Sequence, residues 1–225
     1  AEVFCGVMDQ FACGTGEAGH ALFLDCRSLA YENVPVALGD YRILIMNTGV
    51  KRALATSAYN ERRAQCDEAV RRLVDGGIKA ESLRDVSMEQ LEANKQLLPD
   101  LILRRARHVI GENQRVIDAV AVLKAGDLNR LGALMLESHR SLSEDFEVSC
   151  EELDILIDGL SKSGAVLGAR MTGAGFGGCA VALVAADATQ NLVEELSSRY
   201  SEQFGLTLTT MVLDDNRSAG VITIS

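Results

Sequence analysis

The sequence is poor in the features that mark linkers, membrane spans and zinc sites. Only two prolines occur in 225 residues, and there is no internal repeat or low-complexity tract, so nothing resembles a flexible linker. No stretch reaches about 18 consecutive apolar residues, so we expect no membrane-spanning helix. No two cysteines have C-x-x-C spacing, which argues against a zinc site of that type. The N-terminus has no basic region followed by an apolar core, so no secretory signal is expected.

Charge and cysteine content narrow the possible partners and the compartment. Acidic residues outnumber basic ones by 32 to 22, and the formal net charge of −10 argues against a nucleic-acid-binding or membrane-binding surface. A small anionic ligand stays open, because it needs only a few N–H groups and one or two cations. The six cysteines are too sparse for a disulfide scaffold, so we expect reduced, mostly buried thiols and a cytoplasmic protein.

The hydrophobic pattern predicts an α+β fold, as one large domain or two small ones. Residues 1–50 are expected to form turn-rich β structure around one short helix. Further on, helical periodicity alternates with apolar runs of strand length. Strands are expected over 21–26, 41–47, 165–170, 179–185, 206–213 and 221–224, and helices over about 56–75, from 88, over about 102–125, from 128, from 150 and over about 188–204.

Several helix ends carry capping signals. Ser87 followed three residues later by Gln90 has the form of a capping box, and so does Ser149 followed by Glu152. Gly126 is expected to end the long helix, and Asp127 to cap the next one. Asp187 is expected to cap the last helix.

The strongest local signal is a glycine loop between two expected strands, residues 171–179. Four glycines in six positions, Gly173, Gly175, Gly177 and Gly178, carry a large cost in backbone entropy. Such a backbone can turn N–H groups toward an anion. A glycine-rich turn without a ligand is the alternative at this point. The segment is neither a P-loop nor a dinucleotide-binding loop, because no Gly-Lys-Ser/Thr follows and a strand comes next.

Two other segments could carry chemistry. Asp9 follows a glycine and two apolar residues, so it is either a helix cap or a partly buried, functional carboxylate. Cations stand near the expected start of the second helix, at Lys51-Arg52 and Arg62-Arg63. A cation there opposes the helix dipole unless it has an anionic partner.

Taken together, these segments resemble the galactokinases, a branch of the galactose/homoserine/mevalonate/phosphomevalonate (GHMP) kinase superfamily. The resemblance covers essentially the whole chain, and its segments occur in one order. They are Cys5-Gly6-Val7-Met8-Asp9-Gln10, Tyr59 with Arg62-Arg63 and Cys66, Arg104-Arg105-Ala106-Arg107-His108-Val109-Ile110-Gly111-Glu112, Glu137-Ser138-His139, Glu147-Val148-Ser149-Cys150 and the glycine loop.

The resemblance implies a role for each site residue. Asp9 would be the catalytic base that accepts the proton of the sugar's 1-hydroxyl as that oxygen attacks the γ-phosphate of ATP. Gly6 and Tyr59 would contact galactose together with Asp9. The glycine loop and Lys51 would lie near the phosphates. Ala174 departs from the more usual glycine, and is tolerable only at a negative φ. Arg52 departs from the more usual histidine.

The resemblance also implies that the chain is the C-terminal portion of a two-domain kinase. Residues 1–55 would complete the N-terminal domain, and residues 56–225 would form the C-terminal α+β domain. The main ATP-binding motif and most Mg²⁺ ligands would lie upstream, so we expect no metal site in this chain and no activity from it alone. Its partners would be galactose, ATP and the missing half, and the isolated chain is expected to self-associate.

Other interpretations stay open from the sequence. They are a kinase for N-acetylgalactosamine or a related sugar, a non-catalytic galactose/ATP sensor, and a stand-alone binding module. The remaining charged motif residues are expected to be structural. Arg104, Arg105 and Arg107 should bind helix ends or acidic side chains, and the three histidines, His20, His108 and His139, should pack or hydrogen-bond within the fold.

Overall fold

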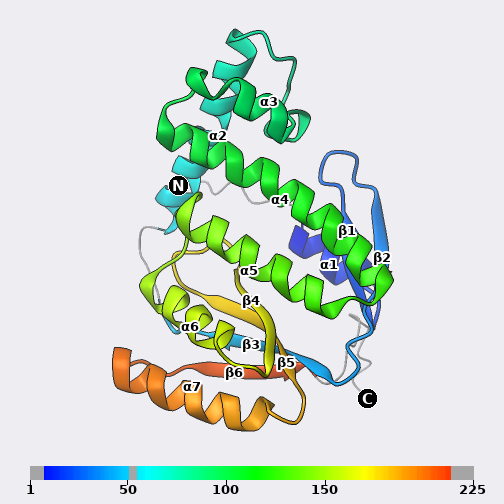
Figure 1. The fold of residues 1–225 in the computed structure, drawn as a ribbon, viewed down its shortest axis with the longest axis vertical. Coiled ribbons are helices and arrows are strands. Elements are labelled where there is room, and N and C mark those ends of the chain that lie inside the picture. Colours follow the sequence, from blue (N-terminus) through cyan, green and yellow to red (C-terminus); the bar gives the residue numbers. More distant parts are fainter. Residues whose placement is uncertain (1–7, 51–54, 214–225) are drawn as a thin grey trace, which may run out of the picture.

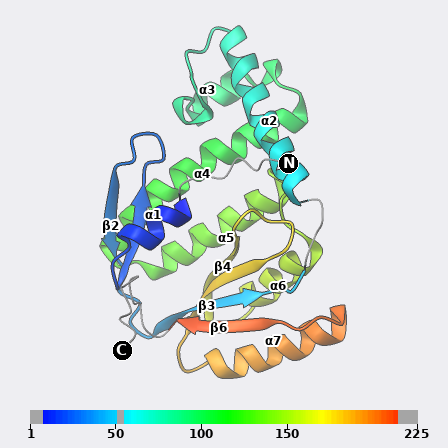
Figure 2. The same cartoon turned by 180° about the vertical axis from the view of Figure 1, so that it is seen from behind.

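The computed structural model describes residues 8–50 and 55–213 (Figures 1 and 2). The helices are α1 (Met8–Thr15), α2 (Ala55–Asp75), α3 (Met88–Ala93), α4 (Asp100–Ala125), α5 (Leu128–Glu144), α6 (Glu151–Ser161) and α7 (Thr189–Phe204), with 3-10 turns η1 (Leu83–Asp85) and η2 (Lys95–Leu97). The strands are β1 (His20–Leu24), β2 (Tyr31–Pro35), β3 (Tyr41–Asn47), β4 (Val166–Thr172), β5 (Cys179–Ala185) and β6 (Thr209–Leu213). The expected α+β class is confirmed.

A four-stranded antiparallel sheet organises the larger part of the fold. Its order is β4-β5-β3-β6, so β3 lies between two strands that come more than 130 residues later. The pairing of β3 with β5 brings Asn47 opposite Cys179, where the glycine loop ends. The sheet therefore draws one strand from the expected first segment, 1–55, and three from the second. That domain boundary stays a prediction.

Two hydrophobic cores hold the molecule together. One joins the sheet to α6 and α7, with Leu44, Met46, Leu153 and Val184 fully buried. The other lies among α2, η1, α3 and α4, the helical layer at the top of Figure 1, and contains Leu73. Burial of apolar area on this scale is the main favourable term in folding.

Helix α5 approaches the sheet at a pair of glycines. A Cβ added to Gly132 of α5 would stand 2.2 Å from the carbonyl oxygen of Leu167, and one added to Gly168 of β4 would stand 2.1 Å from the oxygen of Gly132. No side chain fits at either position. The helix therefore rests on the strand with backbone against backbone.

Most local signals predicted their elements. The Ser87–Gln90 capping box is present, Gly126 ends α4 in a left-handed conformation, and the side chain of Asp127 accepts from the N–H of Arg130. Strand β5 matches its expected range. The expected strand over 221–224 lies outside the described residues.

Two expected caps are wrong. Helix α6 begins one residue later than the Ser149 box requires, with Cys150 as N-cap and no side-chain cap bond. Helix α7 begins after Ala188, also without a side-chain cap bond, so Asp187 is not its cap. Strand β2 was not expected, because a short run containing Glu32, Asn33 and Pro35 has low strand propensity.

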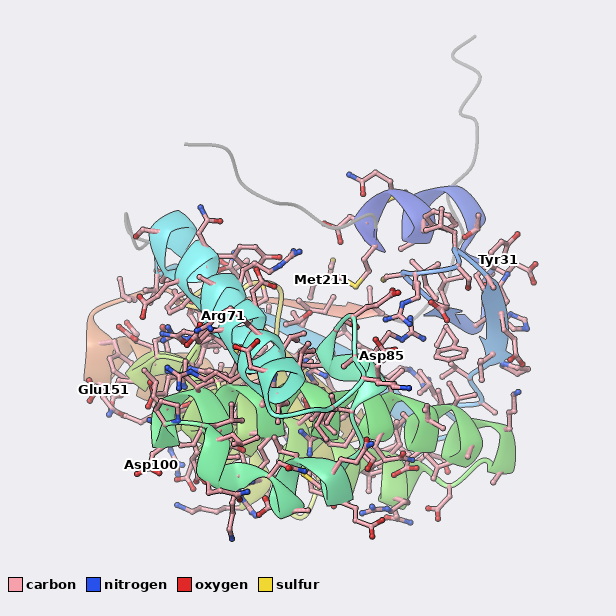
Figure 3. All side chains as sticks on the ribbon, turned by 90° about the horizontal axis from the view of Figure 1, so that it is seen from above. Tyr31, Arg71, Asp85, Asp100, Glu151 and Met211 are labelled. Carbon is pink, nitrogen blue, oxygen red and sulfur yellow. The ribbon has the colours of Figure 1, made fainter. Side chains whose placement is uncertain are left out.

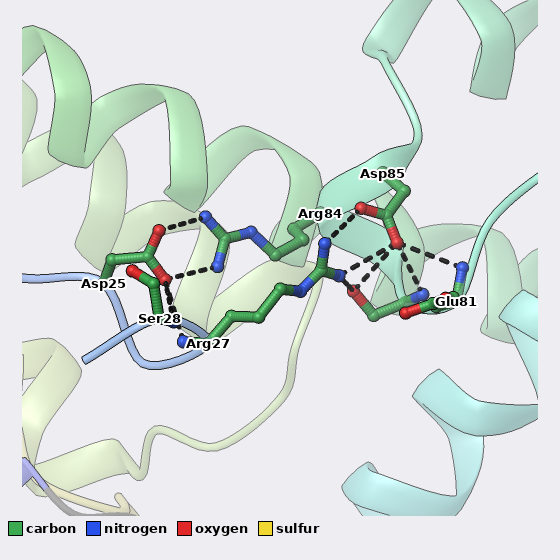
Figure 4. A network of polar contacts seen from close by, with 7 residues as sticks. Asp25, Arg27, Ser28, Glu81, Arg84 and Asp85 are labelled. Atoms are coloured by element: carbon green, nitrogen blue, oxygen red, sulfur yellow. Dashed lines mark hydrogen bonds and ion pairs between the residues drawn. The ribbon is translucent and has the colours of Figure 1, made fainter. Parts of the chain in front are cut away.

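The hairpin of β1 and β2 is tied to η1 by two ion pairs (Figure 4). Both oxygens of Asp25 accept from Arg84, at 2.7 and 2.9 Å, and both oxygens of Asp85 accept from Arg27, at 2.8 and 2.9 Å. In the view of Figure 3, Asp85 is seen with Arg71 of α2 on one side and Tyr31 of the hairpin on the other. The arginines hold the pKa values of both carboxyls well below their usual range.

The described residues contain no helix that is long and apolar enough to cross a membrane. The cysteines among them form no disulfide, and of Cys13, Cys26, Cys66, Cys150 and Cys179 only Cys150 is buried. The expectation of mostly buried thiols is therefore wrong. Burial and the nearby Asp67 raise the pKa of Cys66 to about 11, which makes this thiol unreactive at neutral pH.

Candidate active site

The glycine loop connects β4 to β5, and all four predicted glycines have positive φ. The values are +81° at Gly173, +86° at Gly175, +120° at Gly177 and +82° at Gly178. Ala174 is not among the residues with positive φ, which is the condition that its methyl group requires.

Two of these glycines also allow close contact with neighbouring backbone. A Cβ at Gly175 would lie 2.2 Å from the carbonyl oxygen of Val148, and one at Gly177 would lie 2.8 Å from the oxygen of Val50. At Gly173 and Gly178 there is open space, so only the backbone angle favours glycine there. The loop is thus wedged between the end of β3 and the connection from α5 to α6.

Hydrogen bonds fix the middle and the C-terminal end of the loop. The N–H of Phe176 donates to the carbonyl of Val148 at 2.6 Å. The buried Thr48 donates to the carbonyl of Gly178 through its N–H, at 2.9 Å, and through its hydroxyl, at 2.8 Å. The hydroxyl of Tyr200 on α7 donates to the carbonyl of Thr48 at 2.8 Å. The loop backbone is held in one shape, as a preformed anion-binding backbone would be.

Asp9 lies in the first turn of α1 and is exposed. A carboxylate there is stabilised by the helix dipole. In the described part of the chain Asp9 is not the partly buried carboxylate that one interpretation of its neighbours offered. The role expected for Asp9 rests on the resemblance of its segment to the galactokinases. Gly6 lies outside the described residues.

Tyr59 is half-buried near the start of α2. One turn further on, Arg62 finds acceptors on the α5–α6 connection, with Nε donating to the carbonyl of Phe146 at 2.6 Å and Nη2 to that of Glu147 at 3.0 Å. Arg63 pairs with Asp67 on the surface. The cations near this helix start therefore have acceptors, while Lys51 and Arg52 lie outside the described residues.

The arginine-rich segment of α4 binds a helix end and acidic side chains, as expected. Arg104 donates to the carbonyl of Glu144 at 2.8 Å and to the carboxylate of Glu147 at 2.5 Å. Arg105, only 1% exposed, donates to Gln65, to the carbonyl of Asp145 and to Glu147. Arg105 and then Arg104 lower the pKa of Glu147.

The arginine Arg107 pairs with Glu92 instead, at 2.6 Å. It lies on the same helix but takes no part in the α5–α6 connection.

The histidines have structural contacts. His108 is buried, stacks on Phe146 with ring centroids 4.3 Å apart, and its Nδ1 lies 3.0 Å from the hydroxyl of Ser141. Burial lowers the pKa of His108 to about 4, so the ring is neutral at pH 7. His139 lies between the N–H of Met171 and the carboxylate of Asp154. The exposed His20 bonds the carbonyl of Ala18.

Sequence reasoning missed three residues that hold the loop. The loop is bonded by Val148 and Thr48, and Thr48 is bonded in turn by Tyr200. These residues come from segments far apart in the chain. Glu147 and Val148 did belong to the segments that carried the resemblance, which was the one available signal.

Comparisons with known proteins give the class. Residues 119–203 match the family model described as GHMP kinases C terminal. Homoserine kinase from Cytophaga hutchinsonii, at 14% identity and a TM-score of 0.55 over 90% of this chain and 50% of that one, shares the fold. Residues 119–203 are therefore similar to the C-terminal domain of the GHMP kinases.

Within that class the chain is similar to galactokinases. It is 46% identical to the galactokinase of Bos taurus over 89% of this chain and 50% of that protein, and 46% identical to that of Enterococcus faecalis over 89% and 52%. The crystal structure of Lactococcus lactis galactokinase complexed with galactose matches with a TM-score of 0.90 and 44% identity, covering 96% of this chain and 56% of that one. The chain spans about half the length of these relatives.

Proposed function

We propose that this chain forms part of an ATP-dependent kinase that phosphorylates galactose on its 1-hydroxyl. The observation that carries the proposal is the match to a galactokinase structure solved with galactose, at a TM-score of 0.90 over 96% of the chain. The glycine loop supports it, because open space beside Gly173 and Gly178 lets an anion approach the backbone there.

In the proposed reaction Asp9 accepts the proton of the 1-hydroxyl, and the sugar oxygen bonds to the γ-phosphorus of ATP. The bond from that phosphorus to the bridging oxygen breaks, and ADP leaves. Phosphoryl transfer depends mainly on positioning and charge neutralisation, so one carboxylate suffices as the base. Gly6 and Tyr59 contact the sugar.

The phosphate end of ATP is assigned to the glycine loop, through Gly173, Gly175, Gly177 and Gly178, and to Lys51. The described residues offer no group of three or more His, Cys, Asp or Glu side chains that could hold a metal ion. We therefore assign no Mg²⁺ ligand to these residues.

The test is sugar-dependent ADP release by the full-length native protein that contains this sequence. Galactose, N-acetylgalactosamine, homoserine and mevalonate are compared, and phosphorus–proton NMR identifies the phosphorylated oxygen. We expect turnover with galactose and a phosphate on C1. Preference for N-acetylgalactosamine would support the related-sugar alternative. Binding of galactose and ATP without ADP release would support the sensor alternative.

A further inference from the structure

The last residue of α5 and the first part of its connection to α6, residues 144–148, are held by arginines through consecutive carbonyls. The carbonyl of Glu144 accepts from Arg104, that of Asp145 from Arg105, and those of Phe146 and Glu147 from Arg62. The next carbonyl, that of Val148, accepts from the N–H of Phe176 in the glycine loop. Five carbonyls in a row are therefore fixed, and the last one fixes the loop.

The backbone is also strained at the contact between this connection and the glycine loop. Among the described residues only three non-glycine residues have positive φ: Leu29, Glu147 at +53° and Phe176 at +61°. Phe176 is the donor of the hydrogen bond to Val148, and Glu147 directly precedes the acceptor. A left-handed conformation costs a non-glycine residue roughly 1–2 kcal/mol and persists only where the surroundings impose it.

The carboxylate of Glu147 supplies that constraint. Its Oε1 accepts from Arg104 at 2.5 Å and its Oε2 from Arg105 at 2.6 Å. Hydrogen bonds between ionised groups are about twice as strong as neutral ones. Arg105 is 1% exposed, and each of its three nitrogens has an acceptor. A buried guanidinium that lost one of these acceptors would leave a desolvated donor unpaired, so the arrangement resists small shifts.

We propose that Glu147, with Arg62, Arg104 and Arg105, is the positioning unit that sets the shape of the glycine loop and so the affinity for the phosphates of ATP. The inference rests on the proposed function for its ATP part. None of these residues needs to contact a substrate, because they act through the carbonyl of Val148.

The test uses the full-length protein and three variants of the unit beside one control. Arg104→Gln and Glu147→Gln each remove one charge from the unit. Arg107→Gln is the control, because Arg107 lies on the same helix, is 37% exposed like Arg104, and pairs with Glu92 outside the unit. Glu147→Gly accepts the positive φ without strain but lacks the carboxylate.

Two measurements are made on each protein. Hydrogen exchange followed by mass spectrometry reads the amides of residues 173–178, whatever the activity. Steady-state kinetics give the KM for ATP and the KM for galactose separately. We expect Arg104→Gln, Glu147→Gln and Glu147→Gly to speed exchange in the loop and to raise the KM for ATP by about 10-fold, which corresponds to a loss of about 1.4 kcal/mol in binding. The KM for galactose should not change, and Arg107→Gln should match wild type in both measurements.

Each other outcome has one meaning. Unchanged loop exchange in Glu147→Gln would overturn the inference, and so would wild-type exchange in Glu147→Gly, because the residue would then serve only as a turn. Faster exchange with an unchanged KM for ATP would overturn the link to phosphate. If the wild-type protein released no ADP with galactose, the proposed function would fail, and the exchange comparison alone would decide the positioning role.

Discussion

Two side chains that can carry a charge, Arg105 and His108, are buried in this protein, and their hydrogen-bond partners differ. Arg105 and His108 stand one turn apart on α4 and are both buried. The arginine has an acceptor for each of its three nitrogens, whereas burial leaves the histidine neutral. The buried guanidinium is thus fully hydrogen-bonded, and the buried imidazole is uncharged at pH 7.

The neutral state of His108 predicts a pH dependence of stability. Burial is the main cause of its low pKa, Arg115 and Arg170 add to it, and Glu112 and Asp145 oppose it. Because the folded pKa of about 4 lies below the unfolded value of 6.5, the unfolded chain binds the proton first. Stability from this group is therefore complete above pH 6.5 and is lost as pH falls toward 4, by on the order of 3 kcal/mol.

Urea unfolding of wild type, His108→Gln and His20→Gln at several pH values between 7 and 4 tests this prediction. His108→Gln should flatten the decline in the free energy of unfolding, while the exposed His20 serves as the control and should leave it unchanged. Equal slopes in all three proteins would show that His108 does not titrate between these limits.

Tyr59 allows a test of the sugar site. In the full-length protein, Tyr59→Phe should weaken galactose binding by about 1 kcal/mol, the net value of one hydrogen bond, and leave ATP affinity unchanged. Calorimetric titration with each ligand measures both. An unchanged galactose affinity would remove Tyr59 from the site.

At the scale of elements, the glycine loop needs glycine for two different reasons, which are close contact with neighbouring backbone at Gly175 and a positive φ alone at Gly173. Gly175→Ala must move the backbone of Val148, because its Cβ would lie 2.2 Å from that carbonyl oxygen. Gly173→Ala has open space and pays only for its positive φ, roughly 1–2 kcal/mol. We expect Gly175→Ala to be the more destabilising variant and to lose kinase activity. Urea unfolding and ADP release measure the two effects, and equal losses would mean that the contact with Val148 is unimportant.

Elements with local signals were predictable from the sequence, and those set by distant contacts were not. The Ser87 box, the Gly126 stop and the Asp127 cap depend on residues within one turn, and all three are present. The start of α6 depends on the connection that arginines of α2 and α4 hold, so the Ser149 box failed. The turn before α7 closes between Ala188 and Ala185, which leaves Asp187 no place as a cap.

The candidate site shows the same division. The glycines of the loop and the negative φ at Ala174 followed from residue types alone. The anchors of the loop did not, because Thr48 reaches Gly178 only once β3 pairs with β5, and Val148 and Tyr200 come from other distant segments. The left-handed conformation of Phe176 has no sequence signal at all, since an aromatic residue disfavours it.

At the scale of the whole molecule, the chain covers about half of the galactokinases that it matches. A recombinant protein of these 225 residues alone is therefore expected to release no ADP with galactose, although its loop is preformed. A coupled ADP assay beside the full-length protein measures this. Turnover by the 225 residues would show that the described chain and its termini hold a complete nucleotide site.

The most direct test of the proposed function is Asp9→Asn in the full-length protein. The amide keeps the size and the hydrogen-bonding shape of the carboxylate but cannot accept the hydroxyl proton. Loss of a general base typically lowers the rate by about 10²–10⁴-fold, so kcat should fall by that amount. Galactose should still raise the melting temperature, which separates lost chemistry from lost folding. A variant that kept more than about a tenth of the wild-type kcat would contradict Asp9 as the base.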